Sequence, residues 1–228
     1  MFKSLITSGD AKTKKGEPLG YRTGIMYLSP ADQSGVINVC PSASLGCKLM
    51  CLNTAGRGQM DMVQQVRLSR TLLLKNDRAA FEAQLEKEVA KLIASATRAK
   101  MIPAIRINGT SDMPSLAMPL AEKFPTIQFY DYTKLPRPWT RVRANYDITF
   151  SRSETNEKDC LDALHNGINV AVVFSTKKTE AFPESYLGFE VINGDEHDLR
   201  FLDKKGVIVG LTAKGKAKRD TTGFVVQV

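Results

Sequence analysis

Short β-rich runs alternate with helical stretches along most of this 228-residue sequence. The runs predicted to be strands are residues 24–29, 102–107, 127–131, 146–150, 169–174, 190–192 and 207–211, with 223–228 as a closing segment. Helical periodicity covers residues 62–74, 77–98, 115–123 and 157–166. Because a helix between two strands carries the chain back across the sheet, successive strands pair in parallel. The sequence therefore predicts a single α/β domain with a largely parallel sheet, either an open wound sheet or a partial barrel of about six units.

The longest helical stretch indicates which residues form the core. In residues 77–98, Phe81, Leu85, Val89 and Leu92 recur on one face at helical spacing. Asn76 precedes this stretch and is the expected N-cap, because its side chain can accept a hydrogen bond from the first turn. The apolar face predicts a helix packed against the sheet.

The terminal segments and the charge bear on partners and compartment. Residues 1–22 are polar and basic and are expected to form an irregular arm before a domain of residues 23–228. The formal charge of +8 favours nucleic acid or another acidic partner, although the basic runs 12–15 and 214–219 have the composition of solvated tails. No apolar run reaches membrane-spanning length, and residues 1–15 lack the apolar core of a signal peptide. These features predict a cytosolic protein with no membrane segment.

Three of the four cysteines form a cluster, C-x6-C-x3-C, at Cys40, Cys47 and Cys51. In the cytosol such a cluster is more typical of a metal site than of disulfides. Three thiolates can hold a [4Fe-4S] cluster that keeps one iron open for a small molecule. A zinc site needs a fourth ligand, and His197 and Cys160 are the candidates. Cys160 lies on an apolar helical face and is expected in the core.

Polar side chains follow three of the predicted strands. They are Asn108, Thr110, Ser111 and Asp112, then Asp131 and Lys134, then Ser151, Arg152 and Glu154. Gly109 lies within the first of these groups and is a candidate binding position with them. Because the carboxyl ends of parallel strands open on one face, these residues are expected to meet there. Asp112 and Lys134 are candidate catalytic groups. Each residue taken singly also has a structural explanation, such as a helix cap or a surface ion pair.

A second polar segment, residues 193–200, contains Asp195, His197 and Asp198. Carboxylates beside a histidine suit a hard divalent metal or acid–base catalysis. The same composition suits a solvated, hydrogen-bonded turn. His197 is therefore a third candidate catalytic residue as well as a candidate metal ligand.

Five segments together resemble a family of bacteriophage and prophage proteins: residues 39–58, 106–112, 130–134, 149–154 and 194–201. The resemblance covers most of the chain, and its motifs are specific. It implies a phage-encoded protein that works in the host cytosol.

More distantly, the layout is similar to that of the radical S-adenosylmethionine (radical SAM) enzymes. In these, three cysteines after the first strand of a partial (β/α)6 TIM-type barrel hold a [4Fe-4S] cluster, and its open iron binds S-adenosylmethionine. The resemblance implies that residues 109–112 receive the methionine amino group, and that Ser151, Arg152 and Glu154 meet the ribose and carboxylate. The cysteine spacing differs from the C-x3-C-x2-C that is usual in that superfamily.

The leading hypothesis from the sequence is a phage-type iron–sulfur protein, radical-SAM-like, whose open iron binds a small molecule such as S-adenosylmethionine. One alternative is a structural Zn²⁺ protein that contacts nucleic acid or protein. The other is a divalent-metal hydrolase centred on Asp195, His197 and Asp198.

Overall fold

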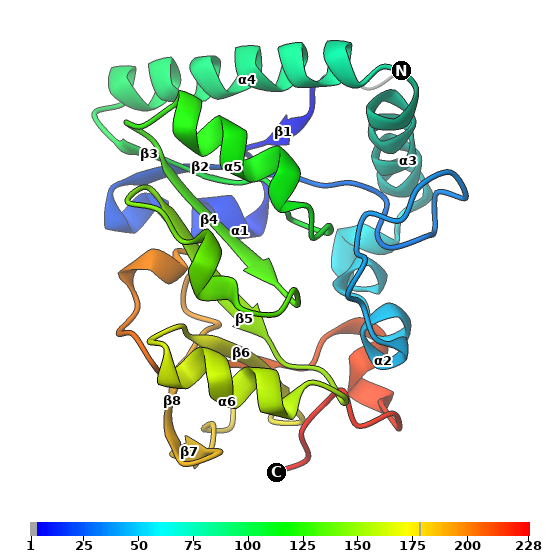
Figure 1. Cartoon of the computed structure of the whole chain (residues 1–228), viewed down its shortest axis with the longest axis vertical. Coiled ribbons are helices and arrows are strands. Elements are labelled where there is room, and N and C mark those ends of the chain that lie inside the picture. Colours follow the sequence, from blue (N-terminus) through cyan, green and yellow to red (C-terminus); the bar gives the residue numbers. More distant parts are fainter. Residues whose placement is uncertain (1–3, 178) are drawn as a thin grey trace.

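Residues 4–177 and 179–228 are described by the computed structural model of the protein (Figure 1). The described strands form one sheet in the order β1-β2-β3-β4-β5-β6-β9-β8-β7. They are β1 (Ile6–Thr7), β2 (Tyr21–Met26), β3 (Ile102–Arg106), β4 (Gln128–Thr133), β5 (Tyr146–Ser151), β6 (Val170–Phe174), β7 (Ser185–Tyr186), β8 (Phe189–Asn193) and β9 (Ile208–Thr212). All neighbouring pairs from β2 to β8 are parallel, and β1 and β7 add antiparallel at the edges. The predicted α/β fold with a largely parallel sheet is confirmed.

One strand departs from sequential order. β9 pairs with β6 on one side and with β8 on the other. The chain therefore forms the edge strands β7 and β8 first, and β9 then fills the position between β8 and β6. As a result, the segments that follow β8 and β9 both leave the sheet at its carboxyl edge, beside the ends of β3, β4 and β5. The closing segment 223–228 does not form a strand of its own and contributes one parallel bridge, between Phe174 and Val226.

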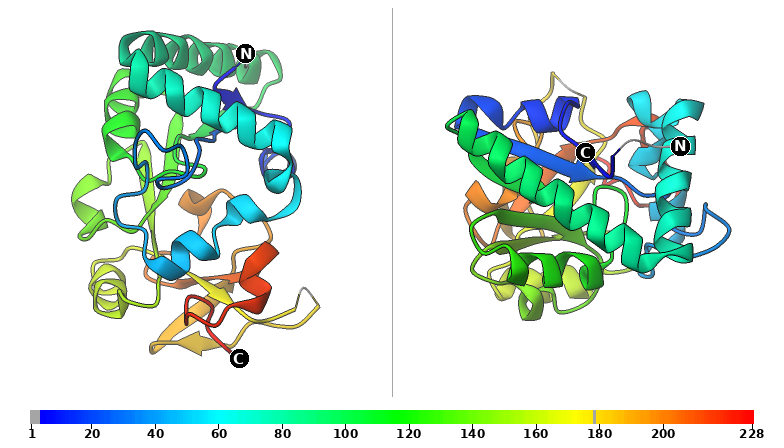
Figure 2. Two further views of the ribbon diagram at one scale, coloured as in Figure 1. Left: turned by 90° about the vertical axis from the view of Figure 1, so that its right-hand side faces the viewer. Right: turned by 90° about the horizontal axis from the view of Figure 1, so that it is seen from above.

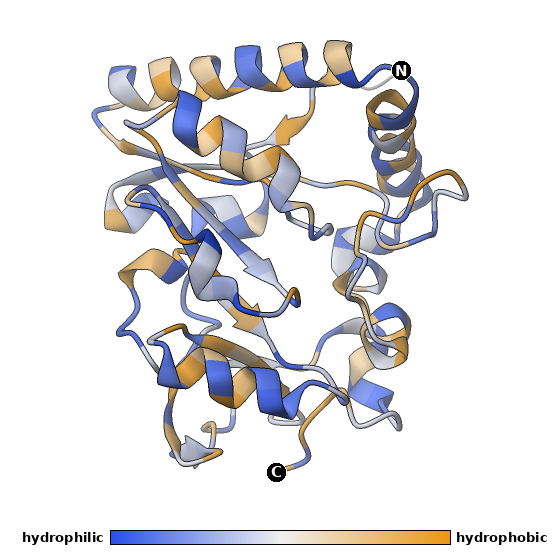
Figure 3. Cartoon of the chain, viewed as in Figure 1, coloured by the Kyte–Doolittle hydropathy of each residue, from blue (hydrophilic) through white to orange (hydrophobic). Residues whose placement is uncertain are grey.

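The helices are α1 (Ala11–Lys14), α2 (Leu45–Leu49), α3 (Asp61–Asn76), α4 (Arg78–Arg98), α5 (Pro114–Lys123) and α6 (Glu157–His165). α4 crosses the end of the molecule at the top of Figure 1, and its apolar and polar residues alternate along the ribbon in Figure 3. As predicted, Phe81, Leu85 and Val89 are fully buried, and each such side chain contributes about 1.5–3 kcal/mol through burial. Among the described residues, no helix combines the length and apolar character needed to cross a bilayer.

The start of α4 differs from the prediction. The N-cap is Asp77 rather than Asn76, because α3 continues through Asn76. The Asp77 carboxylate accepts a hydrogen bond from the Ala80 backbone N–H at 2.9 Å. Asp77 is therefore the single residue between the two helices, and it both ends α3 and caps α4.

A second core lies between α6 and the sheet. Cys160 and Leu164 on α6 are buried against Phe150, Val172 and Phe174. The expected core position of Cys160 is confirmed.

The amino-terminal segment is more ordered than the expected irregular arm. Within residues 4–22 the chain forms β1, α1 and the 3₁₀ helix η1 (Glu17–Leu19) before β2 begins. The Leu5 and Ile6 backbone N–H groups donate to the Glu88 carboxylate of α4 at 2.9 and 2.8 Å. Asp10 caps α1 and also accepts a hydrogen bond from the Tyr27 hydroxyl at 2.7 Å. These bonds fix α1 against the carboxyl end of β2, a placement that the polar composition of the segment did not indicate.

Candidate functional site

A cavity of about 290 Å³ opens at the carboxyl ends of the parallel strands. Its wall includes Arg106 at the end of β3, Thr133 of β4, Ser151 of β5 and Thr212 of β9. The cysteine loop also lines it, and this loop lies beside the 3₁₀ helix η6 (Gly215–Arg219) on the same side of the molecule (Figures 1 and 2). This is the edge at which parallel α/β sheets bind ligands. The volume is close to the lower end of the roughly 300–1,000 Å³ of small-molecule sites.

Cys40, Cys47 and Cys51 all line this cavity, and all three are free thiols. Cys47 lies in α2, whereas the other two lie in irregular backbone on either side of that helix. Burial is the largest cause that raises the pKa of Cys40 to about 12, and it also raises the pKa of Cys51. Both thiols are therefore protonated at neutral pH, and a metal that binds them must displace their protons.

The cysteines converge on one cavity without forming a site for a single ion. Among residues 4–177 and 179–228, no group of three or more His, Cys, Asp or Glu side chains is placed to hold a metal ion. His197, a candidate fourth ligand, lines the same cavity. Cys160, the other candidate, is fully buried on the inner face of α6, where its Sγ donates to Asn156 Oδ1 at 3.5 Å.

The loop after β3, residues 107–113, is hydrogen-bonded to the cysteine loop. The Cys40 Sγ donates to the Thr110 carbonyl at 3.5 Å and accepts from the Ala31 backbone N–H at 3.3 Å. On its other side the loop lies close to the end of β2, and Gly109 permits this because a Cβ there would lie 2.5 Å from the Met26 carbonyl oxygen. Residues 109–112 all line the cavity, at the strand end where they were expected.

Asn108 supports this loop from below and is not part of the cavity wall. Its backbone N–H and its Nδ2 donate to the buried Asp131 carboxylate at 2.7 and 2.9 Å. The Tyr146 hydroxyl donates to the same carboxylate at 3.1 Å. Burial raises the pKa of Asp131 to about 6, against these hydrogen bonds, which lower it. Asn108 and Asp131 thus have a structural role in shaping the site.

Asp112 and Lys134, two candidate catalytic residues, both line the cavity. Asp112 accepts hydrogen bonds from Thr133 Oγ1 at 2.7 Å and from the Lys134 backbone N–H at 2.8 Å. Burial raises the pKa of Asp112 above its usual value. The Lys134 ammonium lies 5.6 Å from the centre of the Phe224 ring.

The predicted group after β5 divides into one cavity residue and two structural residues. Ser151 lines the cavity. The Arg152 guanidinium donates instead to the carbonyls of Gly223 and Phe224, at 2.7 and 2.8 Å, and so fixes the carboxyl-terminal segment. Glu154 binds the first turn of α2. Neither charged side chain is among the residues of the cavity wall.

Asp198 is at the centre of a buried polar network. Its carboxylate lies 3.3 Å from Arg106 Nη1 and 3.5 Å from Lys12 Nζ, and it accepts from the Tyr130 hydroxyl at 3.4 Å. The Arg106 guanidinium also stacks over the Tyr132 ring, with 4.3 Å to its centre. Although burial opposes ionisation, the charges of Lys12 and Arg106 keep the pKa of Asp198 below its usual value.

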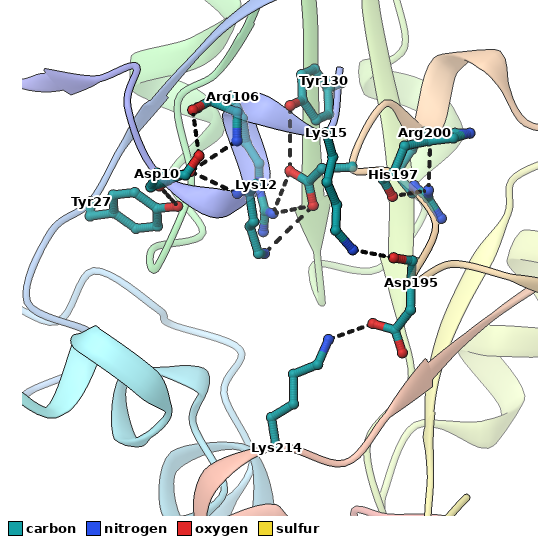
Figure 4. A network of polar contacts seen from close by, with 12 residues as sticks. Asp10, Lys12, Lys15, Tyr27, Arg106, Tyr130, Asp195, His197, Arg200 and Lys214 are labelled. Atoms are coloured by element: carbon teal, nitrogen blue, oxygen red, sulfur yellow. Dashed lines mark hydrogen bonds and ion pairs between the residues drawn. The ribbon is translucent and has the colours of Figure 1, made fainter. Parts of the chain in front are cut away.

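Asp195 and His197 belong to separate contacts around this network (Figure 4). Asp195 pairs with Lys214, accepts from the Thr212 backbone N–H at 2.9 Å, and its carbonyl accepts from Lys15. His197 Nδ1 lies 3.2 Å from Arg200 Nη2. Burial and the Arg200 charge lower the pKa of His197, so the ring is neutral near pH 7. The three residues of the predicted hydrolase centre, Asp195, His197 and Asp198, all line the cavity, but each is bonded to different side chains.

Four cations of the site were not among the candidate residues predicted from the sequence: Lys12, Lys15, Arg106 and Lys214. Lys12, Lys15 and Lys214 line the cavity, although the basic runs that contain them had the composition of solvated tails. Arg106 offered a usable signal, because an arginine within an otherwise apolar strand needs a partner when it is buried. The position of its partner, Asp198, depends on the fold.

Comparison with known proteins gives one match. No curated protein and no solved structure matches the chain significantly. A family model described as Gene product 88 matches residues 4–228. The match covers nearly the whole chain, including the cysteine loop and both polar segments, and agrees with the expected phage-type family. The chain therefore belongs to the Gene product 88 family.

Proposed function

We propose that this protein binds a small molecule in the cavity, and that Cys40, Cys47 and Cys51 hold a [4Fe-4S] cluster in its wall. The observation that carries the proposal is the convergence of three free thiols on one cavity with polar residues from the strand ends. The fourth cysteine, Cys160, belongs to the core instead.

The donor set suits such a cluster. Thiolates are the usual protein ligands of iron–sulfur clusters, and three of them leave one iron position open. Burial raises the pKa of Cys51, and the charges of Lys134 and Arg67 act against that rise. When bound, the cluster would supply electron transfer and an open coordination position. The chain itself would orient the ligand through residues 109–112 and Ser151, which line the cavity.

The strand order also supports a likeness to a partial (β/α)6 barrel. β2, β3, β4, β5, β6 and β9 are six consecutive parallel neighbours, and the cysteine loop follows the first of them. S-adenosylmethionine is the ligand that this likeness implies. Because Arg152 and Glu154 bind other parts of the chain, Ser151 is the member of the predicted ribose and carboxylate group that we assign to the ligand. The host cytosol, whose reducing poise keeps thiols free, is the compartment that fits this chemistry.

The test is anaerobic purification of the full chain, with measurement of iron, acid-labile sulfide and the visible absorption spectrum. We expect stoichiometric iron and sulfide in the wild type, and their loss when Cys40, Cys47 and Cys51 are all replaced by serine. Cys160→Ser is the matched control and should keep the cluster. Iron at the same level in the triple variant would refute the assignment of ligands.

Two other outcomes would select the alternatives. Stoichiometric zinc without iron, with unfolding on chelation, would favour the structural zinc protein. Hydrolysis that is lost in His197→Gln and kept in the triple cysteine variant would favour the divalent-metal hydrolase. Isothermal titration of the iron-loaded protein with S-adenosylmethionine then tests the ligand separately from the cluster.

A further inference from the structure

The cavity wall carries more positive than negative charge. Its cationic side chains are Lys12, Lys15, Arg106, Lys134 and Lys214, and its carboxylates are Asp112, Asp195 and Asp198. Five cations against three carboxylates leave an excess of two positive charges. The wall is therefore electrostatically suited to a negatively charged group.

Asp198 is shared between two of these cations. Its distances of 3.3 Å to Arg106 and 3.5 Å to Lys12 are longer than the roughly 2.7–2.9 Å of a strong charge-assisted hydrogen bond. One carboxylate thus neutralises neither cation fully. The other carboxylates do not make up the difference, because Asp195 pairs with Lys214 and Asp112 is bonded to the end of β4.

Arg106 keeps an unused donor. Its residue is only 6% exposed, yet its Nε has no hydrogen-bond partner among the described residues. The Nε atoms of Arg67, Arg141, Arg152 and Arg200 also have none, but none of those four residues lines the cavity. A buried polar group without a partner is uncommon in native structures, and a ligand is one of the partners that can satisfy it. Lys134 forms no ion pair within residues 4–177 and 179–228, and its ammonium lies 5.6 Å from the centre of the Phe224 ring.

We propose that the cationic side of the cavity binds an oxyanion, a phosphate or a carboxylate group of the small-molecule ligand. Arg106 and Lys12 are the inner donors, and Lys15 and Lys214 are the exposed donors nearer solvent (Figure 4). Guanidinium and ammonium groups are the side chains that recognise such oxyanions best. The inference rests on the proposed function only in placing this group on the same ligand.

The oxyanion donors and the cysteines are held by different elements. Lys12 lies in α1 and Lys15 directly follows it, β3 carries Arg106, and Lys214 follows β9, whereas the cysteines lie in and around α2. The anion site can therefore be tested in protein that has no cluster. That separation makes the two proposals independently testable.

The experiment is isothermal titration of the full chain with pyrophosphate and, in a second arm, with succinate, at constant ionic strength. The variants are the double substitution Lys12→Gln with Lys15→Gln, and Lys14→Gln as the control. Lys14 lies on the same helix but does not line the cavity. We expect the double variant to bind roughly tenfold or more weakly, because it loses two charged donors, and the control to match the wild type. Equal affinity in the double variant, or no binding of either anion to the wild type, would overturn the inference.

Two further measurements keep the test decisive. Lys15→Gln alone removes a donor whose contact in the protein is a backbone carbonyl, so it is informative if the double variant does not fold. It should weaken binding while its thermal unfolding without ligand is unchanged.

Binding that persists in the triple cysteine variant supports the anion site even if no iron is found. A normal iron content with no anion binding refutes the anion site and leaves the cluster proposal intact. Tighter binding of pyrophosphate than of succinate identifies phosphate as the recognised group, and the reverse identifies carboxylate.

Discussion

Glu154 binds the backbone of Gly46, because its Oε1 accepts a hydrogen bond from the Gly46 N–H at 2.7 Å. The other carboxylate oxygen accepts from the hydroxyl of Ser44, the N-cap of α2, at 2.8 Å. Glu154 follows β5, so these two bonds join the cysteine helix to the sheet across more than 100 residues of sequence. A Cβ on residue 46 would lie 2.5 Å from Thr222 Oγ1 and 2.6 Å from Glu154 Oε2, so a larger residue there would have to displace these side chains. The position of Cys47 depends on this contact.

Glu154→Ala should therefore loosen the cysteine loop. We expect the free energy of unfolding to fall by about 1–2 kcal/mol, since two hydrogen bonds to a partly exposed carboxylate are lost. The Cys47 thiol should also react faster with a thiol reagent, because α2 loses its contact with the sheet. Denaturant unfolding and labelling kinetics followed by mass spectrometry measure the two effects. Glu157→Ala, three residues further on at an exposed site, is the control, and an equal effect there would contradict this explanation.

Gly109→Ala should destabilise the protein strongly. The added Cβ would lie 2.5 Å from the Met26 carbonyl oxygen, and backbone cannot move aside as a flexible side chain can. We expect a loss of about 1–3 kcal/mol, the usual result of overpacking. Gly9→Ala is the matched control, because a Cβ added there would meet no described atom within 4 Å. Similar melting temperatures for the two variants would show that the loop after β3 accommodates the methyl group.

Asp131 should make stability fall as pH rises through the mildly acidic range. Burial raises its folded-state pKa to about 6 from 3.8, so between these values the folded protein binds more protons than the unfolded chain. The stabilisation is complete below the unfolded pKa and is lost as pH rises through the folded pKa, with a total of roughly 2–3 kcal/mol. Other carboxylates have lowered pKa values and act in the opposite direction, so the comparison must be made with Asp131→Asn. Urea unfolding at several pH values from about 4 to 7 should give a wild-type-minus-variant difference that decreases with pH. A constant difference would mean that Asp131 titrates normally.

Asp198→Asn should be far more harmful than the same change on the surface. The substitution leaves Arg106 and Lys12 without their shared counter-charge, and removing one partner of a buried pair costs about 3–5 kcal/mol. Asp162→Asn breaks the exposed pair with Lys158 and should cost less than about 1 kcal/mol. Pyrophosphate should raise the melting temperature of Asp198→Asn more than that of the wild type, because two cations are freed for it. Thermal unfolding with and without the anion measures both effects, and a smaller shift in the variant would argue against these cations as its donors.

Local sequence patterns were sufficient for much of the fold. The alternation of strands and helices predicted the parallel sheet, and the spacing of Phe81, Leu85 and Val89 predicted the buried face of α4. Parallel topology also placed residues 109–112, Lys134 and Ser151 at one edge, where the structure has the cavity. These predictions succeeded because periodicity and strand direction are properties of neighbouring residues, which the sequence records directly.

The sequence by itself determined the α/β class, the helical core faces and the approach of strand-end residues to one edge. Only the tertiary structure decided which distant groups meet there. Arg106 and Asp198 are 92 residues apart, and they form a pair because the segment after β8 packs back over the middle strands, with Leu199 in one cluster with Ala104 of β3 and Tyr130 of β4. The basic composition around Lys12 predicted a solvated side chain, whereas in the structure Lys12 pairs with the buried carboxylate of Asp198. The physical reason is that burial and charge pairing depend on the three-dimensional path of the whole chain, which no local pattern contains.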